Sequence, residues 1–138
     1  NYRYWLHYAE GSLMPLLVMK LIFDRIENAK VPFFIKPVTK GVVNQVMVSY
    51  LGPNLKTQME FVEEYLSDHE FFGGDSFNAA DVQMLFPLEG AMNQPAFAEK
   101  YPMILDYVKR MQARPAYQRA LAAGEPYAFA QDQALKVK

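Results

Sequence analysis

The chain of 138 residues contains no cysteine. It therefore forms no disulfide bond, and it offers neither a thiolate nucleophile nor a zinc site of the common cysteine-containing kinds. The absence of disulfides fits the reducing environment of the cytoplasm, where we expect the protein to reside.

The chain also lacks a dominant charge and a long hydrophobic run. Its 14 Lys and Arg nearly balance 15 Asp and Glu, which leaves a net charge of −1. This balance gives no general electrostatic reason to expect a polyanionic partner. The longest apolar run, Leu13 to Met19, contains Pro15 and is far shorter than the roughly 20 residues of a membrane-spanning helix. We therefore expect neither nucleic acid nor a membrane among the partners.

Apolar residues are abundant and are spaced as in helices. With 51% hydrophobic residues, the chain is apolar enough to bury the core of one domain. Apolar positions three and four apart predict a long first helix over 2–26 and a second over 38–66, with a pause at Gly52-Pro53. No segment shows the alternation of a strand. The sequence predicts an all-α bundle of about five to six helices.

Proline and glycine divide the pattern. Pro15 lies inside the first helix, where its missing amide and its ring predict a kink. The connector 29–37 carries Phe33-Phe34-Ile35, and we expect this apolar loop to pack against another surface that covers its rings. A glycine-containing loop over 68–77 precedes a helix that begins at Asn78. Later helices are predicted to follow Pro102 and Pro115.

The string Asn78-Ala79-Ala80-Asp81 has the residues of a helix capping box. The Asn78 side chain is expected to accept from the Asp81 amide, while the Asp81 carboxylate accepts from the Asn78 amide. Small or apolar neighbours indicate that this helix start is buried. A buried box is then expected to stabilise the fold by more than the ~1 kcal/mol of an exposed cap.

The whole arrangement resembles the C-terminal helical domain of glutathione transferases, in the bacterial and fungal branch. That family opens a buried helix with a Gly-rich turn and a Ser/Thr-x-Ala-Asp box, and Asn78 replaces the Ser or Thr while keeping a capping oxygen. Further similar segments are Tyr8-Ala9-Glu10-Gly11-Ser12-Leu13-Met14-Pro15, Met84-Leu85-Phe86-Pro87-Leu88, Tyr101-Pro102 and Arg114-Pro115-Ala116-Tyr117. The resemblance implies a domain over 1–127, followed by a tail over 128–138.

The resemblance also implies what the chain does not carry. In this family a Ser, Tyr or Cys of an N-terminal thioredoxin-like domain activates the thiol of glutathione. The chain begins at Asn1 already inside an amphipathic pattern, and we expect that domain to lie upstream. No catalytic residue is therefore expected in this chain, which alone is expected to be inactive. Glutathione is implied as a co-substrate of the parent protein, with no cofactor.

The first helix holds the candidate site residues. Tyr4, Tyr8, Ser12 and Pro15 recur at steps of three or four and are candidates for the wall of a pocket for a hydrophobic electrophile. The alternative is that these rings pack in the core or on the neighbouring domain. The resemblance makes Glu10 a candidate contact for the glutathione bound in the partner subunit of a homodimer. Its alternative role is that of a solvated or capping carboxylate.

Other residues that often carry chemistry lack the necessary context. His7 and His69 are far apart and have no partner signature of a triad or metal site, so we interpret both as structural or surface residues. No metal site is predicted.

Two main classes of function remain open, beside a third in which the chain is a free-standing helical bundle that binds apolar ligands. The parent protein is either a dimeric glutathione transferase that conjugates small electrophiles, or a non-catalytic binding or assembly module of the same fold. A thioredoxin-like domain with an early Ser, Tyr or Cys upstream would favour the enzyme.

Overall fold

The computed structural model describes residues 2–124, so the predicted tail over 128–138 lies outside the described residues. Within this range every regular element is a helix, and one isolated bridge joins Phe71 and Gly74 in the loop before α5. The elements are α1(Tyr2–Tyr8), η1(Ala9–Leu13), α2(Met14–Glu27), α3(Lys36–Val46), η2(Met47–Leu51), α4(Gly52–Asp68), α5(Ala79–Met92), α6(Pro95–Lys100), α7(Pro102–Gln112) and α8(Pro115–Ala123). Since the π-helical turns η1 and η2 join their neighbours without a break, six continuous helices result. The predicted all-α fold is confirmed.

The first long helix contains its irregular turn just before Pro15. At the end of η1 the Met14 amide donates to the Ala9 carbonyl, five residues back instead of four. Such a π turn is a common cause of bending in a helix, and a proline has no amide to continue the regular pattern. The distortion that the sequence predicts near Pro15 therefore takes the form of a π turn.

The second long helix contains a matching turn, and here the predicted pause is wrong. The Gly52 amide donates to the Met47 carbonyl, and the helix continues through Pro53 into α4. A Cβ on Gly52 would lie 2.6 Å from the Met47 carbonyl oxygen, so the turn can close only around a glycine. The glycine thus preserves the helix in a place where the sequence suggested a stop.

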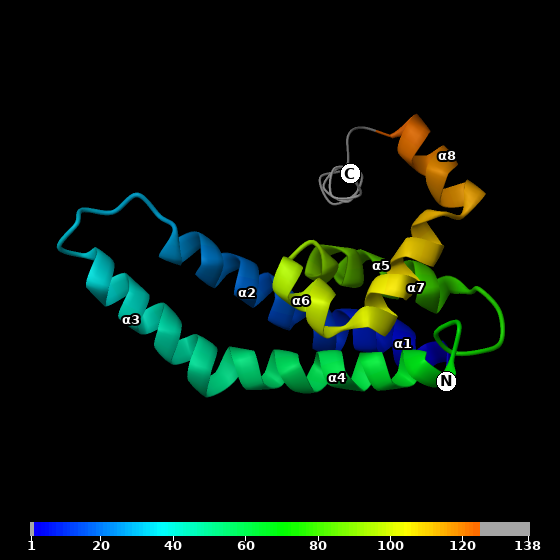
Figure 1. The fold of residues 1–138 in the computed structure, drawn as a ribbon, viewed down its shortest axis with the longest axis horizontal. Coiled ribbons are helices and arrows are strands. Elements are labelled where there is room, and N and C mark those ends of the chain that lie inside the picture. Colours follow the sequence, from blue (N-terminus) through cyan, green and yellow to red (C-terminus); the bar gives the residue numbers. More distant parts are fainter. Residues whose placement is uncertain (1, 125–138) are drawn as a thin grey trace.

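The two long helices run antiparallel and extend beyond the other helices at one end (Figure 1). We call residues 18–50 the arm and the rest of the described chain the body. Within the arm only Val43 is buried. A small cluster of Leu16, Leu51 and Leu55 packs at its base.

The connector at the tip of the arm is exposed, so residues 2–124 do not supply the surface that was expected to cover its rings. Phe33 is 84% exposed and Phe34 66%, and the two rings contact each other edge to face at a centroid distance of 5.6 Å. The connector lies at the far end of the arm, away from the helices of the body (Figure 1).

The core of the body is organised around α5, which contacts α1, α2, α6 and α7. This helix buries side chains on several faces, as a helix surrounded by others must. The short helix α6 was not predicted. The buried apolar side chains of this core, those of α5 included, are Trp5, Tyr8, Ala9, Leu13, Met59, Val62, Leu66, Phe72, Ala80, Met84, Leu88, Ala91, Met92, Tyr101, Ile104, Tyr107, Val108 and Met111.

Asp81 lies at the centre of this core with no exposed surface. Its carboxylate accepts from the Asn78 amide at 2.9 Å, and the Asn78 side chain caps the first turn of α5, accepting from the Ala80 amide at 2.9 Å. The same carboxylate accepts from the Phe72 amide at 2.8 Å and from the Tyr107 hydroxyl at 3.0 Å. Both bonds of the capping box are present, and the carboxylate also ties the preceding loop and α7 to α5.

The hydroxyl of Tyr107 is suited to this donor role. Burial, and then the nearby Asp81 carboxylate, raise the pKa of the Tyr107 phenol above its ordinary value. The phenol therefore stays protonated, so that it can donate to the carboxylate.

A second carboxylate connects two helices of the body. The two oxygens of Glu63 on α4 accept from the amides of Met103 and Ile104, each at 2.9 Å. These amides belong to the first turn of α7, where helix amides have no partner within the helix. Glu63 therefore caps α7 from a different helix.

Candidate functional site

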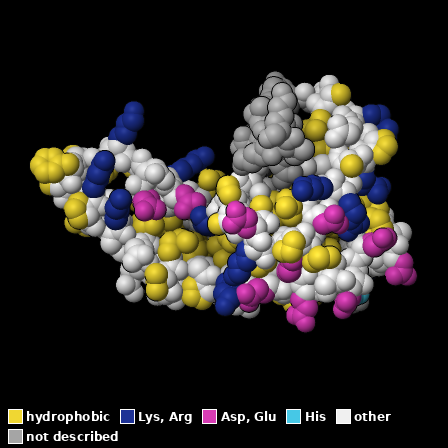
Figure 2. Space-filling model, viewed as in Figure 1, with side chains coloured by type: hydrophobic (Ala, Val, Ile, Leu, Met, Phe, Trp, Pro, Cys, Tyr) yellow, Lys and Arg dark blue, Asp and Glu magenta, His cyan; other side chains and the backbone are white. Residues whose placement is uncertain are grey.

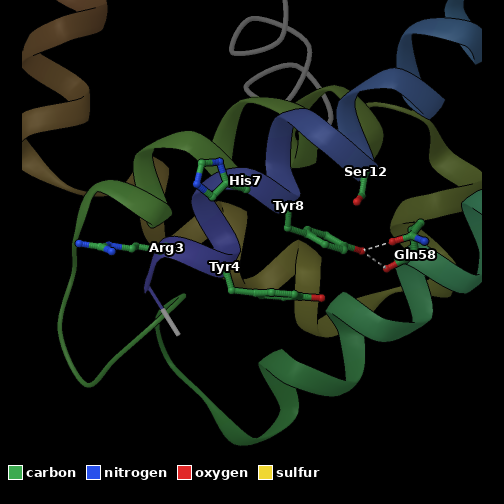
Figure 3. Close-up of a pocket in the computed structure, with 6 residues that line it drawn as sticks. All are labelled: Arg3, Tyr4, His7, Tyr8, Ser12 and Gln58. Carbon is green, nitrogen blue, oxygen red and sulfur yellow. Dashed lines mark hydrogen bonds between the residues drawn. The ribbon is translucent and has the colours of Figure 1, made fainter.

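Three of the four candidate pocket residues line one open cleft on the surface of the body (Figure 3). The cleft has a volume of about 560 Å³ and lies between the first helix and α4. It is lined by Arg3, Tyr4, His7, Tyr8, Ser12 and Gln58.

Pro15, the fourth candidate, does not line the cleft and is exposed. The candidate stripe assumed steps of three and four along an ordinary α-helix. The π turn η1 lies between Tyr8 and Pro15 and contains an extra residue, so the positions after it rotate away from the earlier face. The helical spacing holds as far as Ser12 and fails beyond it.

Tyr8 forms the floor of the cleft and is 6% exposed. Its hydroxyl donates to the side-chain oxygen of Gln58 at 2.6 Å and lies 3.3 Å from the main-chain oxygen of the same residue (Figure 3). Burial, and then the proximity of Tyr4, raise the pKa of the Tyr8 phenol above its ordinary value. At neutral pH it is a protonated donor and not a base.

Tyr4 supplies the accessible aromatic surface. Its ring is stacked on that of Tyr8 at a centroid distance of 5.8 Å, yet the residue is 53% exposed. Its other ring contacts are with Trp5 at 5.3 Å and Phe61 at 6.4 Å, both edge to face. The ring is therefore held by three neighbours while remaining half open to a ligand.

Sequence reasoning missed three residues of the cleft. Arg3 and His7 are one turn apart, each next to a predicted tyrosine, so the same helical spacing could have found them. His7 was interpreted as a structural or surface residue; it is exposed and lines the cleft. Gln58 lies on α4, 50 residues from Tyr8, and no local pattern could have linked it to the cleft.

Glu10 is separate from this cleft. It is exposed, and its carboxylate accepts from the side-chain amide of Gln83 on α5. The structure therefore places Glu10 beside α5, while the tyrosines lie beside α4. Its role as a contact for glutathione stays a prediction.

Neither a metal centre nor a spanning helix is found among residues 2–124. No group of three or more His, Cys, Asp or Glu in this range is arranged to hold a metal ion. None of its helices is both long and apolar enough to cross a bilayer.

Comparison with known sequences identifies the family. Residues 22–115 match the family described as "Glutathione S-transferase, C-terminal domain". The chain belongs to this family. The matched range contains the Asn78 and Asp81 box of the glutathione transferase domain, while the tyrosines of the cleft precede it.

Two relatives of this glutathione transferase domain come from yeasts, consistent with the fungal side of the resemblance. Glutathione S-transferase 3 of Schizosaccharomyces pombe is 30% identical over 116 residues, which cover 84% of this chain and 48% of that protein. Glutathione S-transferase 1 of Saccharomyces cerevisiae is 31% identical over 116 residues, covering 83% of this chain and 50% of that protein. The chain thus spans about half the length of the curated relatives that it matches.

Proposed function

We propose that this chain is the helical half of a dimeric cytoplasmic glutathione transferase that conjugates glutathione to small hydrophobic electrophiles. Its cleft between the first helix and α4 supplies one wall of the electrophile pocket. The observation that carries the proposal is the half-exposed ring of Tyr4, held over the buried Tyr8 in a chain of this family. Open aromatic surface of this kind suits an apolar or aromatic ligand.

The chemistry itself is assigned to the other half of the longer protein. Conjugation requires a group that stabilises the glutathione thiolate, which then attacks the electrophile. Tyr8 is unsuited to accept the thiol proton, because its phenol is already protonated and its hydrogen is directed to Gln58. Within the cleft, Tyr4 and Tyr8 position the electrophile.

The test compares the longer protein, including a thioredoxin-like half, with the 138-residue chain. The longer protein is expected to conjugate glutathione to a chloronitrobenzene and to behave as a dimer in light scattering, while the chain alone shows no conjugation. Conjugation by the chain alone would overturn the placement of the chemistry. A dimer without conjugating activity would instead favour the assembly module.

A matched pair of variants tests the cleft within the longer protein. Tyr4→Ala is expected to raise KM for the electrophile about tenfold and to leave KM for glutathione unchanged, because it removes one aromatic contact. Tyr50→Ala is the control, since Tyr50 is also 53% exposed but lies in η2, outside the cleft. Equal KM values for Tyr4→Ala and the unmodified protein would exclude the cleft as the electrophile site.

A further inference from the structure

The tip of the arm exposes aromatic rings in an unusual way for a protein that has a well-packed core elsewhere. Phe33 and Phe34 are the most exposed phenylalanines of the described chain, at 84% and 66%. Ile35 and Val38 continue the apolar surface at 39% and 65% exposure. Water-exposed apolar surface of this extent commonly marks a place where another apolar phase docks.

The charges of the same segment are segregated. Residues 28–59 contain four of the chain's fourteen basic side chains and none of its fifteen acidic ones. Lys30, Lys36 and Lys40 flank the exposed rings and are themselves exposed, and within the described residues none of them forms a salt bridge. The whole arm, residues 18–50, carries five basic and two acidic side chains, so its net charge is +3 although that of the chain is −1.

The nearest acidic side chains lie behind the tip, in α2. Asp24 is paired with Lys20 at 2.7 Å, and Glu27 follows one turn later as the last residue of α2. At the outer end of the arm, basic and hydrophobic side chains are therefore neighbours (Figure 2). A surface approached tip first meets positive charge and aromatic rings before it meets any carboxylate.

We propose that the arm tip, residues 30–40, docks the protein on an anionic phospholipid surface. The rings of Phe33 and Phe34 enter the region between headgroups and acyl chains, and Lys30, Lys36 and Lys40 remain at the headgroups. Apolar burial and attraction to anionic lipid together are the two terms that hold peripheral proteins at a membrane. This association needs no spanning helix and is independent of the proposed conjugation.

Charge favours lipid over a second copy packed arm to arm. In a symmetric dimer made by the tips, the lysines of one arm would face the lysines of the other, with no carboxylate of residues 28–59 to separate them. Like charges brought together in this way oppose association. An anionic bilayer complements the whole tip at once.

Vesicle sedimentation of the 138-residue chain tests the proposal. The chain is expected to sediment with phosphatidylcholine vesicles that contain phosphatidylserine and to stay in solution with phosphatidylcholine alone. Added salt is expected to weaken the binding.

Phe33→Ser/Phe34→Ser should lower the partition coefficient of the chain on these vesicles about a hundredfold, because it removes the two rings that enter the membrane. Lys36→Gln/Lys40→Gln should lower it about fivefold per lysine.

Two control variants remove similar groups from the body. Val82→Ser removes an apolar side chain that is 59% exposed on α5, and Lys109→Gln removes an exposed charge of α7. Both should bind vesicles like the unmodified chain. The thermal midpoint of every variant should match that of the unmodified chain, and Phe33→Trp gives a second readout through a blue shift of its emission on phosphatidylserine vesicles.

Three results would overturn the proposal. The first is that the chain fails to bind vesicles containing phosphatidylserine, or that Phe33→Trp shows no shift with them. The second is an equal loss of binding in the body controls. The third is a dimer in solution that Phe33→Ser/Phe34→Ser converts to a monomer without any vesicle binding, which would make the tip a self-association surface.

Discussion

The body and the arm are built from the same kind of helix but are held by different means. In the body, Asp81 has no exposed surface and joins α5, α7 and the loop before α5 through one carboxylate. In the arm, Val43 is the only buried side chain between residues 18 and 50, and two phenylalanines are open to water. The difference shows that apolar residues at helical spacing secure helix formation but do not secure burial, which needs surrounding elements on several sides.

The two π turns give a second view of the same contrast. Each precedes a proline, one where the first helix crosses the body and one where the second returns to it. Nothing lies within 4 Å of a Cβ built on Gly11, whereas a Cβ on Gly52 meets the Met47 carbonyl. A larger side chain would fit at Gly11, whereas at Gly52 it would clash with the backbone.

The largest expected effect is that of Asp81→Ala, which should strongly destabilise the body. It leaves the amides of Phe72 and Asn78 and the hydroxyl of Tyr107 without their acceptor in the core. We expect a loss of at least about 3 kcal/mol in the free energy of unfolding, measured by urea denaturation.

Asp75→Ala is the control for this change, since Asp75 is an exposed carboxylate in the loop just before α5. It should change the free energy of unfolding by less than about 0.5 kcal/mol. Similar losses in the free energy of unfolding for the two variants would show that the buried Asp81 carboxylate is not what holds the body together.

The next effect separates the two π turns. Gly52→Ala forces a Cβ to 2.6 Å from a backbone oxygen and is expected to destabilise the protein by about 1–3 kcal/mol. Gly11→Ala meets no neighbour and is expected to stabilise by up to about 1 kcal/mol, because alanine loses less entropy in a helix. Thermal melting followed by circular dichroism measures both, and a shared sign would contradict the steric distinction.

The smallest of the three concerns Glu63, which caps α7 from α4. Glu63→Ala removes the acceptor of the Met103 and Ile104 amides and should cost about 1 kcal/mol, as for other helix caps. Glu64→Ala, on the exposed side of the same helix, should be close to neutral. Faster hydrogen exchange at the two amides in Glu63→Ala alone would locate the effect at the start of α7.

Much of the body could be predicted because its signals are local. Asn78 and Asp81 are three residues apart, so a capping box can be recognised in the sequence, and Pro102 and Pro115 mark helix starts by the fixed geometry of their rings. The helical spacing likewise brought Tyr4, Tyr8 and Ser12 to one cleft.

The missed features depend on partners distant in sequence. Gln58 reaches Tyr8 across 50 residues, and Glu63 reaches α7 across 40. Pro15 does not line the cleft with the other candidates because a π turn before it contains an extra residue. Gly52 allows a helix to continue where the sequence predicts a pause. Each error arises from a contact or a turn that only the folded backbone defines.

The sequence by itself determined most of the helices, the capping box of α5 and the family, since spacing, capping box and motif are properties of neighbouring residues. Only the tertiary structure decided which apolar residues are buried and which are exposed. Phe33 and Phe72 are the same kind of residue, yet one is 84% exposed at the tip of the arm and the other has no exposed surface. The physical reason is that burial requires other elements to surround a side chain, and the arm extends beyond them.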